Sequence, residues 1–198
     1  MLFKGKKRMS VCTLGAPVLS QVAEPVHQVD QETVKLAQEM YEAMVAFNGI
    51  GLAAPQYGVS KRMVVIDVPQ ESVEGVPTPG EEQLLPRMPL VLIDPEILSY
   101  STNKATRDEG CLSVPDVYAP VERPEKVILR SLTLDGDIVE CECGGLLGRC
   151  IQHELDHLDG KLFTDRLTPE AYREVAGDLK RLRRLGEGKS FQRIKTVK

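Results

Sequence analysis

Two of the three histidines in this chain lie four residues apart, with a glutamate directly after the first. They belong to residues 151–160, which read Ile-Gln-His-Glu-Leu-Asp-His-Leu-Asp-Gly. On a helix, this H-E-x-x-H spacing places His153 and His157 on one face, where both imidazoles can bind a single metal ion. Glu154 can then reach a water molecule on that ion. The residue types therefore indicate a metal site that can activate water.

The residues around the two histidines predict a buried helix. Apolar side chains recur at helical spacing from residue 146 to residue 158, and Gly160 follows them, where a left-handed C-cap is favoured. Because apolar residues occupy several sides, we expect this helix in the protein interior. Polar groups there need partners, and a metal ion is a suitable one. The alternative is an accidental H-E-x-x-H on a solvated helix, and the apolar surroundings count against it.

A catalytic metal usually has a third protein ligand, and the sequence offers several candidates. The long metalloprotease pattern ends in a third histidine, but Phe163 stands at that position. Cys150 lies roughly 10 Å along the helix axis from the second histidine, too far to share one ion. Cys111 is favoured because it lies in a Gly-flanked, Pro-bounded stretch. Glu174, on a later predicted helix, is the strongest rival, and spacing alone leaves both open.

Composition predicts an ordinary globular protein. The 198 residues are 42% hydrophobic and 27% charged, so we expect one domain over residues 1–198, with basic tails at residues 1–8 and 186–198. The formal charge is -4, but residues 1–8 carry +4 and residues 178–198 carry +6, which leaves -14 between them. Any attraction to an anionic partner such as the ribosome therefore has to come from the ends, for which solvated, solubilising tails are the alternative.

Other features place the chain in the cytoplasm. The basic N-terminus is not followed by an apolar signal region, and no apolar run approaches the roughly 18 residues of a membrane span. Five cysteines, an odd number, argue against a disulfide framework. Cys141 and Cys143 share a face of a predicted strand and are weak candidates as metal ligands.

Pattern along the chain predicts the remaining elements. Asp30 is a suitable N-cap for an amphipathic helix that ends at residue 48, and residues 168–185 form a last helix. The expected strands are residues 62–68, 90–93, 126–134 and 138–143, the last two joined by an Asp-Gly hairpin turn. Residues 69–89, rich in proline, read as a surface insertion. The expected fold is α+β, with short, mostly antiparallel sheets around a central metal-binding helix and a C-terminal helix.

Three stretches resemble the three motifs of peptide deformylases, in the order of that family. They are residues 49–56 (Gly-Ile-Gly-Leu-Ala-Ala-Pro-Gln), 109–113 (Glu-Gly-Cys-Leu-Ser) and 152–157 (Gln-His-Glu-Leu-Asp-His). The resemblance runs from about residue 14 to residue 168. It departs from the family at the longer insertion of residues 70–89 and at the basic tail, and neither touches a motif.

This resemblance implies a hydrolase that removes the formyl group from the N-terminal formyl-methionine of nascent chains and releases formate. It implies Cys111, His153 and His157 as ligands of one divalent metal, Fe²⁺ in most of the family, although Zn²⁺, Ni²⁺ or Co²⁺ suit such ligands as well. It also implies the following roles: Glu154 as general base, Gln56 and the Leu112 N–H as oxyanion donors, and Ile50, Gly51, Gly110 and Arg149 as substrate-binding residues.

Some alternatives remain open at this point. A His₂Glu zinc peptidase would use Glu174 as its third ligand. A metal-structured module that binds nucleic acid or the ribosome would use the basic ends and perform no chemistry. Glu109 either orients the site or forms a surface ion pair with Arg107.

Overall fold

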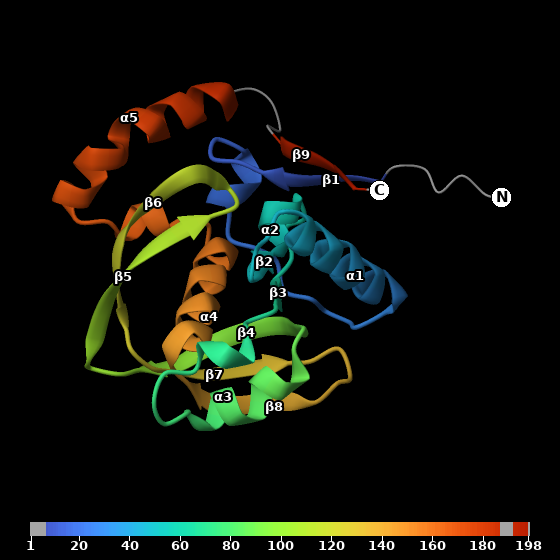
Figure 1. The fold of residues 1–198 in the computed structure, drawn as a ribbon. Coiled ribbons are helices and arrows are strands. Elements are labelled where there is room, and N and C mark those ends of the chain that lie inside the picture. Colours follow the sequence, from blue (N-terminus) through green and yellow to red (C-terminus); the bar gives the residue numbers. More distant parts are fainter. Residues whose placement is uncertain (1–6, 187–191, 198) are drawn as a thin grey trace.

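The chain folds as short helices and antiparallel strands around one central helix, α4 (Figure 1). The computed structural model describes residues 7–186 and 192–197. Within these ranges the α-helices are α1 (Gln31–Ala46), α2 (Ala54–Tyr57), α3 (Pro79–Leu84), α4 (Gly145–Leu158) and α5 (Pro169–Gly186). Short 3-10 helices are η1 (Pro17–Ser20), η2 (Gln70–Ser72), η3 (Leu85–Arg87) and η4 (Phe163–Arg166).

Antiparallel pairing builds three sheets in the described part of the chain. The five-stranded sheet has the order β2 (Gly51–Ala53), β3 (Met63–Ile66), β4 (Leu90–Tyr100), β7 (Val127–Leu132) and β8 (Ile138–Cys143). The two-stranded sheets are β5 (Lys104–Cys111) with β6 (Val114–Pro124), and β1 (Lys7–Cys12) with β9 (Gln192–Val197). Strands and helices in this arrangement confirm the predicted α+β class.

The predicted buried helix is α4, and it lies between the five-stranded sheet and the β5–β6 hairpin (Figure 1). Leu147, Ile151 and Leu158 belong to a cluster of buried apolar side chains that comes largely from the five-stranded sheet. The opposite side of the helix carries the polar residues of the sequence motif. The apolar side chains of α4 thus pack against the sheet. Its buried polar side chains require hydrogen-bond or ionic partners from elsewhere.

Local signals in the sequence were correct for several elements. Asp30 caps α1, since its side chain accepts the Thr33 N–H at 2.8 Å. The Asp-Gly turn joins β7 to β8, and Gly136 adopts a φ of +85°, a left-handed conformation that glycine favours. Predicted strand limits were less accurate, because β3 ends at Ile66 and β4 continues to Tyr100.

The predicted surface insertion is corrected in part, because the buried residues of this segment lie within residues 78–85, which pack against the core. Helix α3 lies along β8, and Leu84 is fully buried. Close approach is possible because residue 80 is glycine: a side chain there would meet Cys143 Sγ at 2.5 Å. Thr78 caps α3, and its hydroxyl also accepts the Gly144 N–H at 3.2 Å, directly before α4. This segment therefore supports the start of the central helix.

Parts of the two predicted basic tails form a pair of strands. Residues 7 and 8 of the first predicted tail belong to β1, and β1 pairs with residues 192–197 of the second predicted tail in an unbroken six-residue register. Neither segment has a sequence pattern that would have predicted this pairing. The rest of the two predicted tails, residues 1–6, 187–191 and 198, lies outside the described residues. Across the described ranges, no helix is long and apolar enough to cross a membrane.

Replacing Thr78 by Ala should lower the free energy of unfolding by about 1–3 kcal/mol, because the change removes a helix cap and leaves the Gly144 N–H buried without its acceptor. Urea unfolding measures this loss. Thr102→Ala, at an exposed threonine, is the matched control and should change stability by less than about 0.5 kcal/mol. Equal losses in the two variants would contradict the supporting role of residue 78.

Candidate metal centre

Helix α4 and strand β5 bring three potential metal ligands together. His153 and His157 lie one turn apart on α4, and Cys111 ends β5 beside them. The distance from Cys111 Sγ to His157 Nε2 is 3.2 Å. One ligand atom from each of these three residues lies within 4.8 Å of the other two. The three side chains thus converge on one point, as ligands of a single ion must.

Cys111 occupies an irregular end of its strand. The register of β5 on β6 shifts between Gly110 and Cys111, and this irregularity ends regular pairing at the cysteine. The Ser113 N–H and the Gln56 side-chain amide both donate to the sulfur at 3.4 Å. Burial opposes ionisation of the thiol, but the imidazoles of His157 and His153 outweigh it and lower the pKa of Cys111 well below its usual value. The thiolate is the form that binds metals.

A buried carboxylate orients the first histidine. Glu109 Oε2 lies 2.9 Å from His153 Nδ1, so that nitrogen donates and Nε2 is left to face the cysteine and the second histidine. Burial opposes ionisation of Glu109, but hydrogen bonds from His153 and Arg123 hold the pKa of its carboxyl below the usual range. The alternative surface pair of Glu109 with Arg107 is not found, because Arg107 binds Glu74 instead.

The donor set fits a divalent metal ion. A thiolate and two imidazoles are the ligands that zinc, iron, cobalt and nickel accept in proteins, and three protein ligands leave a position for water or substrate. Burial lowers the pKa of His153, but the negative groups of Cys111 and Glu109 outweigh it and raise that pKa well above its usual value. Surroundings that favour a positive charge at this point also favour a bound cation.

Gln56 lies against the same cluster. Its side-chain oxygen accepts the Ala53 N–H at 2.8 Å, which fixes the amide and directs its nitrogen toward Cys111 Sγ and Ser113 Oγ, 3.2 Å from the latter. Gln56 is fully buried on the short helix α2. The chain thus holds a hydrogen-bond donor beside the candidate metal position.

Glu154 is buried next to the two histidines. One of its oxygens, Oε2, has no hydrogen-bond partner among the described residues. The other oxygen lies against the backbone of residue 51, where a side chain in place of Gly51 would begin only 2.3 Å from it. Burial raises the pKa of Glu154, and the neighbouring imidazoles oppose that shift. A carboxylate whose pKa is raised above its ordinary value is a stronger base and is suited to accept a proton.

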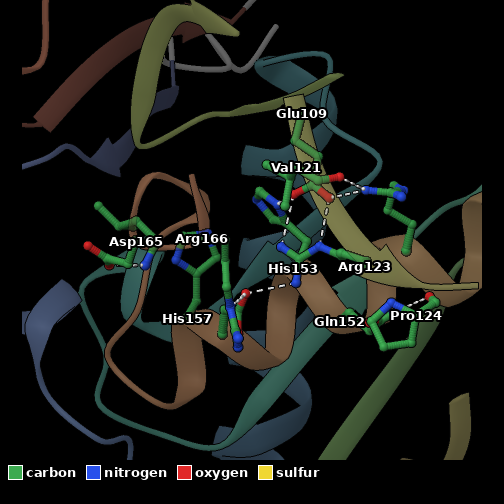
Figure 2. A network of polar contacts seen from close by, with 12 residues as sticks. Glu109, Val121, Arg123, Pro124, Gln152, His153, His157, Asp165 and Arg166 are labelled. Carbon is green, nitrogen blue, oxygen red and sulfur yellow. Dashed lines mark hydrogen bonds and ion pairs between the residues drawn. The ribbon is translucent and has the colours of Figure 1, made fainter. Parts of the chain in front are cut away.

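A network of charges, most of them buried, connects these groups (Figure 2). Arg123 donates to both oxygens of Glu109, at 2.6 and 2.9 Å, and to Asp156 at 2.9 Å. Arg149 donates a hydrogen bond to Glu109 at 2.7 Å, and Arg166 donates two hydrogen bonds to Asp156. Burial opposes the charge of Asp156, but Arg166 and Arg123 lower its pKa. The network therefore joins β5 and β6 to α4 directly behind the histidines.

A pocket of about 470 Å³ opens onto the cluster. The turn after α1, residues 47–51, forms one wall, and the end of β5 with the following turn forms another. Leu146, Arg149 and Cys150 of α4 complete the lining around His153 and Glu154. The four residues that the resemblance implied for substrate binding, Ile50, Gly51, Gly110 and Arg149, all line this pocket. Leu112, expected as an oxyanion donor, lines it as well.

The structure separates the candidate ligands that the sequence left open. Glu174, the rival third ligand, is exposed on α5 and is not part of the cluster. Cys150 is buried, with its sulfur 3.7 Å from the Ile50 carbonyl. Cys141 and Cys143 share a strand face as predicted, their sulfurs 3.8 Å apart in the apolar core. Of the candidates for the third position, Cys111 alone joins the two histidines within the described residues.

Sequence reasoning missed three residues of the site. Ser113, fully buried, accepts the Gln56 amide, and Arg123 and Asp156 form the centre of the charge network. Of the three, only Asp156 could have been identified from the sequence, because a carboxylate on a buried helix requires a cationic partner. That partner lies 33 residues earlier on β6, at a position that nothing local distinguishes.

Comparison with known proteins gives consistent matches. A family model described as polypeptide deformylase matches residues 8–172. The chain is 47% identical over 162 residues to peptide deformylase 2 of Gloeobacter violaceus, which covers 82% of this chain and 80% of the relative. It is also 47% identical over 152 residues to the peptide deformylase of Agrobacterium fabrum, covering 77% and 82%.

Solved structures agree with the sequence matches. A Plasmodium falciparum peptide deformylase in complex with an inhibitor superimposes with a TM-score of 0.75 at 30% identity, covering 88% of this chain and 99% of that one. A peptide deformylase from Synechococcus elongatus in complex with actinonin gives 0.71 at 38% identity, covering 84% and 85%.

Replacing Arg123 by Met should lower the free energy of unfolding by about 3–5 kcal/mol, because Glu109 and Asp156 would lose a buried cationic partner. Denaturant unfolding with the metal-loaded protein measures the loss. Arg107→Met, on the same hairpin but in an exposed ion pair, is the control and should cost no more than about 1 kcal/mol. A similar small loss for both would show that the buried network does not hold the hairpin to α4.

Proposed function

Since the chain belongs to the polypeptide deformylase family, we propose that Cys111, His153 and His157 hold one divalent metal ion and that Glu154 is the general base beside it. The family assignment makes the chain a metal-dependent hydrolase that removes the formyl group from the amino terminus of newly made polypeptides. One observation carries the proposal for the residues: three ligand atoms within 4.8 Å lie at a pocket that also holds a buried carboxylate.

The metal that we propose is Fe²⁺, following the resemblance to the family. The thiolate and two imidazoles suit Zn²⁺, Ni²⁺ and Co²⁺ as well, since ligand softness does not distinguish these ions sharply. When bound, the ion supplies Lewis-acid chemistry, because it lowers the pKa of a water molecule and polarises the formyl carbonyl.

Glu154 moves the proton in the reaction that we propose. It accepts one proton from the attacking water as the water oxygen forms a bond to the formyl carbon. It then gives that proton to the amide nitrogen as the carbon–nitrogen bond breaks, so that formate and a free amino terminus leave. Burial raises the pKa of Glu154, which makes its carboxylate a stronger base for the first of these steps.

Gln56 and Leu112 stabilise the negative charge on the formyl oxygen in this proposal. The Gln56 amide is held in advance by the Ala53 N–H, so it need not reorganise during the reaction. The Leu112 backbone N–H follows Cys111 directly, and Leu112 lines the pocket. Donors fixed beside a buried centre are worth more than donors in water.

Two open strand edges flank the pocket and would hold the peptide. β2 is an edge strand of the five-stranded sheet, and β5 pairs with β6 on one side. We propose that backbone groups at Ile50, Gly51 and Gly110 bind the extended peptide by strand addition. Leu146 and Cys150, beside Arg149, would shape the pocket for methionine. Arg149 would bind the peptide from a fixed position, because its guanidinium donates hydrogen bonds to Glu109 and to the Ala105 and Val121 carbonyls.

The alternatives are not favoured. A His₂Glu peptidase has no third ligand here, since Glu174 is exposed and outside the cluster. A purely structural metal site would need no pocket and no buried carboxylate beside it.

Nascent formylated chains are the substrates that the family implies. We propose that the protein acts in the cytoplasm and meets them at the ribosome, where the basic residues of the C-terminal end would contact RNA. Ribosome cosedimentation across a salt series tests this contact: each lost phosphate contact should reduce the salt slope by about one. Unchanged slopes after substitution of exposed basic residues such as Arg183 and Arg184 would reject it.

Replacing Glu154 by Gln should reduce formate release from a formyl-methionyl peptide by about 10²–10⁴-fold, because the side chain keeps its shape but cannot accept the proton. Metal content, measured by elemental analysis after anaerobic purification, should stay at one ion per chain. The same measurement identifies the ion.

Glu174→Gln is the matched control, and it should keep both metal and activity because this glutamate is exposed on α5. Loss of metal from the Glu174 variant would support the peptidase alternative. Full activity of the Glu154 variant would reject the assignment of the general base.

A further inference from the structure

The C-terminal end of α1 forms part of the substrate pocket. Helix α1 ends at Ala46, and Phe47, Asn48, Gly49 and Ile50 follow as a tight turn that lines the pocket. Asn48 adopts a left-handed φ of +59°, and a side chain at Gly49 would lie 2.8 Å from Leu112 on the opposite wall. We call residues 47–50 the wall turn. The wall turn leads directly into β2, one of the two strand edges beside the pocket.

The helix that carries this turn lacks a cation of its own where one is favoured. The last turn of α1 contains no basic residue. Helix C-termini expose carbonyl groups without intrahelical partners and carry a partial negative charge. A positive side chain from elsewhere in the chain would stabilise this end.

Lys195 of β9 supplies that charge. Its Nζ donates to the Ala46 carbonyl at 2.5 Å and lies 5.9 Å from the centre of the Phe47 ring. It therefore contacts the last residue of the helix and the first residue of the wall turn at once. The contact combines a charge-assisted hydrogen bond with a cation–π interaction.

Strand β9 is held firmly enough to carry such a contact. It pairs with β1 over six residues, and Lys195 lies opposite Met9. Met9 and Val11 of β1 are buried in the same apolar cluster as Met44 and Phe47 of the α1 end. The β1–β9 pair thus lies beside α1 and α2, as Figure 1 shows. Lys195 therefore lies on a strand, β9, whose partner β1 packs in the core next to the wall turn.

We infer that Lys195 is a positioning residue for substrate binding, through which the C-terminal strand braces the wall turn of the peptide pocket. This inference rests on the proposed function, since it assumes that the peptide binds along Ile50. Lys195 is not among the residues that line the pocket, nor among the candidate metal ligands. It acts by ordering residues 47–50 before the peptide arrives, so that less conformational freedom is lost on binding.

The test compares three variants in the full chain loaded with metal. Lys195→Met removes the charge and the donor but keeps an unbranched apolar side chain, and it should raise KM for a formyl-methionyl peptide about two- to fivefold with kcat unchanged. Lys195→Arg keeps the positive charge and the hydrogen-bond donors, so its KM should equal that of the unsubstituted protein. Lys35→Met, at an exposed lysine on α1 itself, should leave both constants unchanged.

A second readout does not depend on activity. Amide hydrogen exchange, followed by mass spectrometry over residues 43–53, should become faster in Lys195→Met and return to the original rate in Lys195→Arg. Unchanged KM and unchanged exchange in Lys195→Met would overturn the inference, and so would an equal effect of Lys35→Met. A wild-type protein without activity on formylated peptides would instead reject the proposed function, while the exchange result would still report on the brace.

Discussion

The candidate site depends on one buried negative charge, the carboxylate of Glu109. A carboxylate in the interior is costly unless cations and hydrogen-bond donors surround it. Here they come from β6 through Arg123, and from α4 through Arg149 and His153. These partners belong to two elements, β6 and α4, and the charge of Glu109 on β5 is in contact with both. The alignment of the β5–β6 hairpin with the central helix therefore follows from satisfying a single charge, and the same contact fixes which nitrogen of His153 faces the cluster.

Local patterns accounted for much of the fold. The spacing of apolar residues identified α4 and α1, Asp30 marked a helix start, and Asp135 with Gly136 marked a hairpin. Each of these signals operates within a few residues, where propensity and turn chemistry decide the backbone conformation. The convergence of Cys111 on the two histidines was favoured by composition but could not be derived from spacing, since 46 positions separate Cys111 from His157.

Long-range contacts explain what the sequence did not reveal. Arg123 stands in a strand of alternating burial like many others, and only the approach of α4 turns it into the centre of a charge network. The α3 segment read as surface because its prolines and glutamates dominate its composition, although Gly80 lets it press against β8. Lys195 contacts Ala46 across 149 positions of chain, which no local pattern can encode. Tertiary packing overrides composition at these places.

The pairing of β1 with β9 also has a consequence for how the protein is made. A ribosome synthesises β1 long before β9, and a strand cannot complete its hydrogen bonds until its partner exists. Through most of translation, one edge of β1 must therefore remain without its neighbour while the core behind it forms. Such late closure gives the protein a high contact order at its two ends and makes docking of the last strand a natural final step of folding. An enzyme that processes nascent chains thus cannot close its own β1–β9 pair until residues 192–197 have been made.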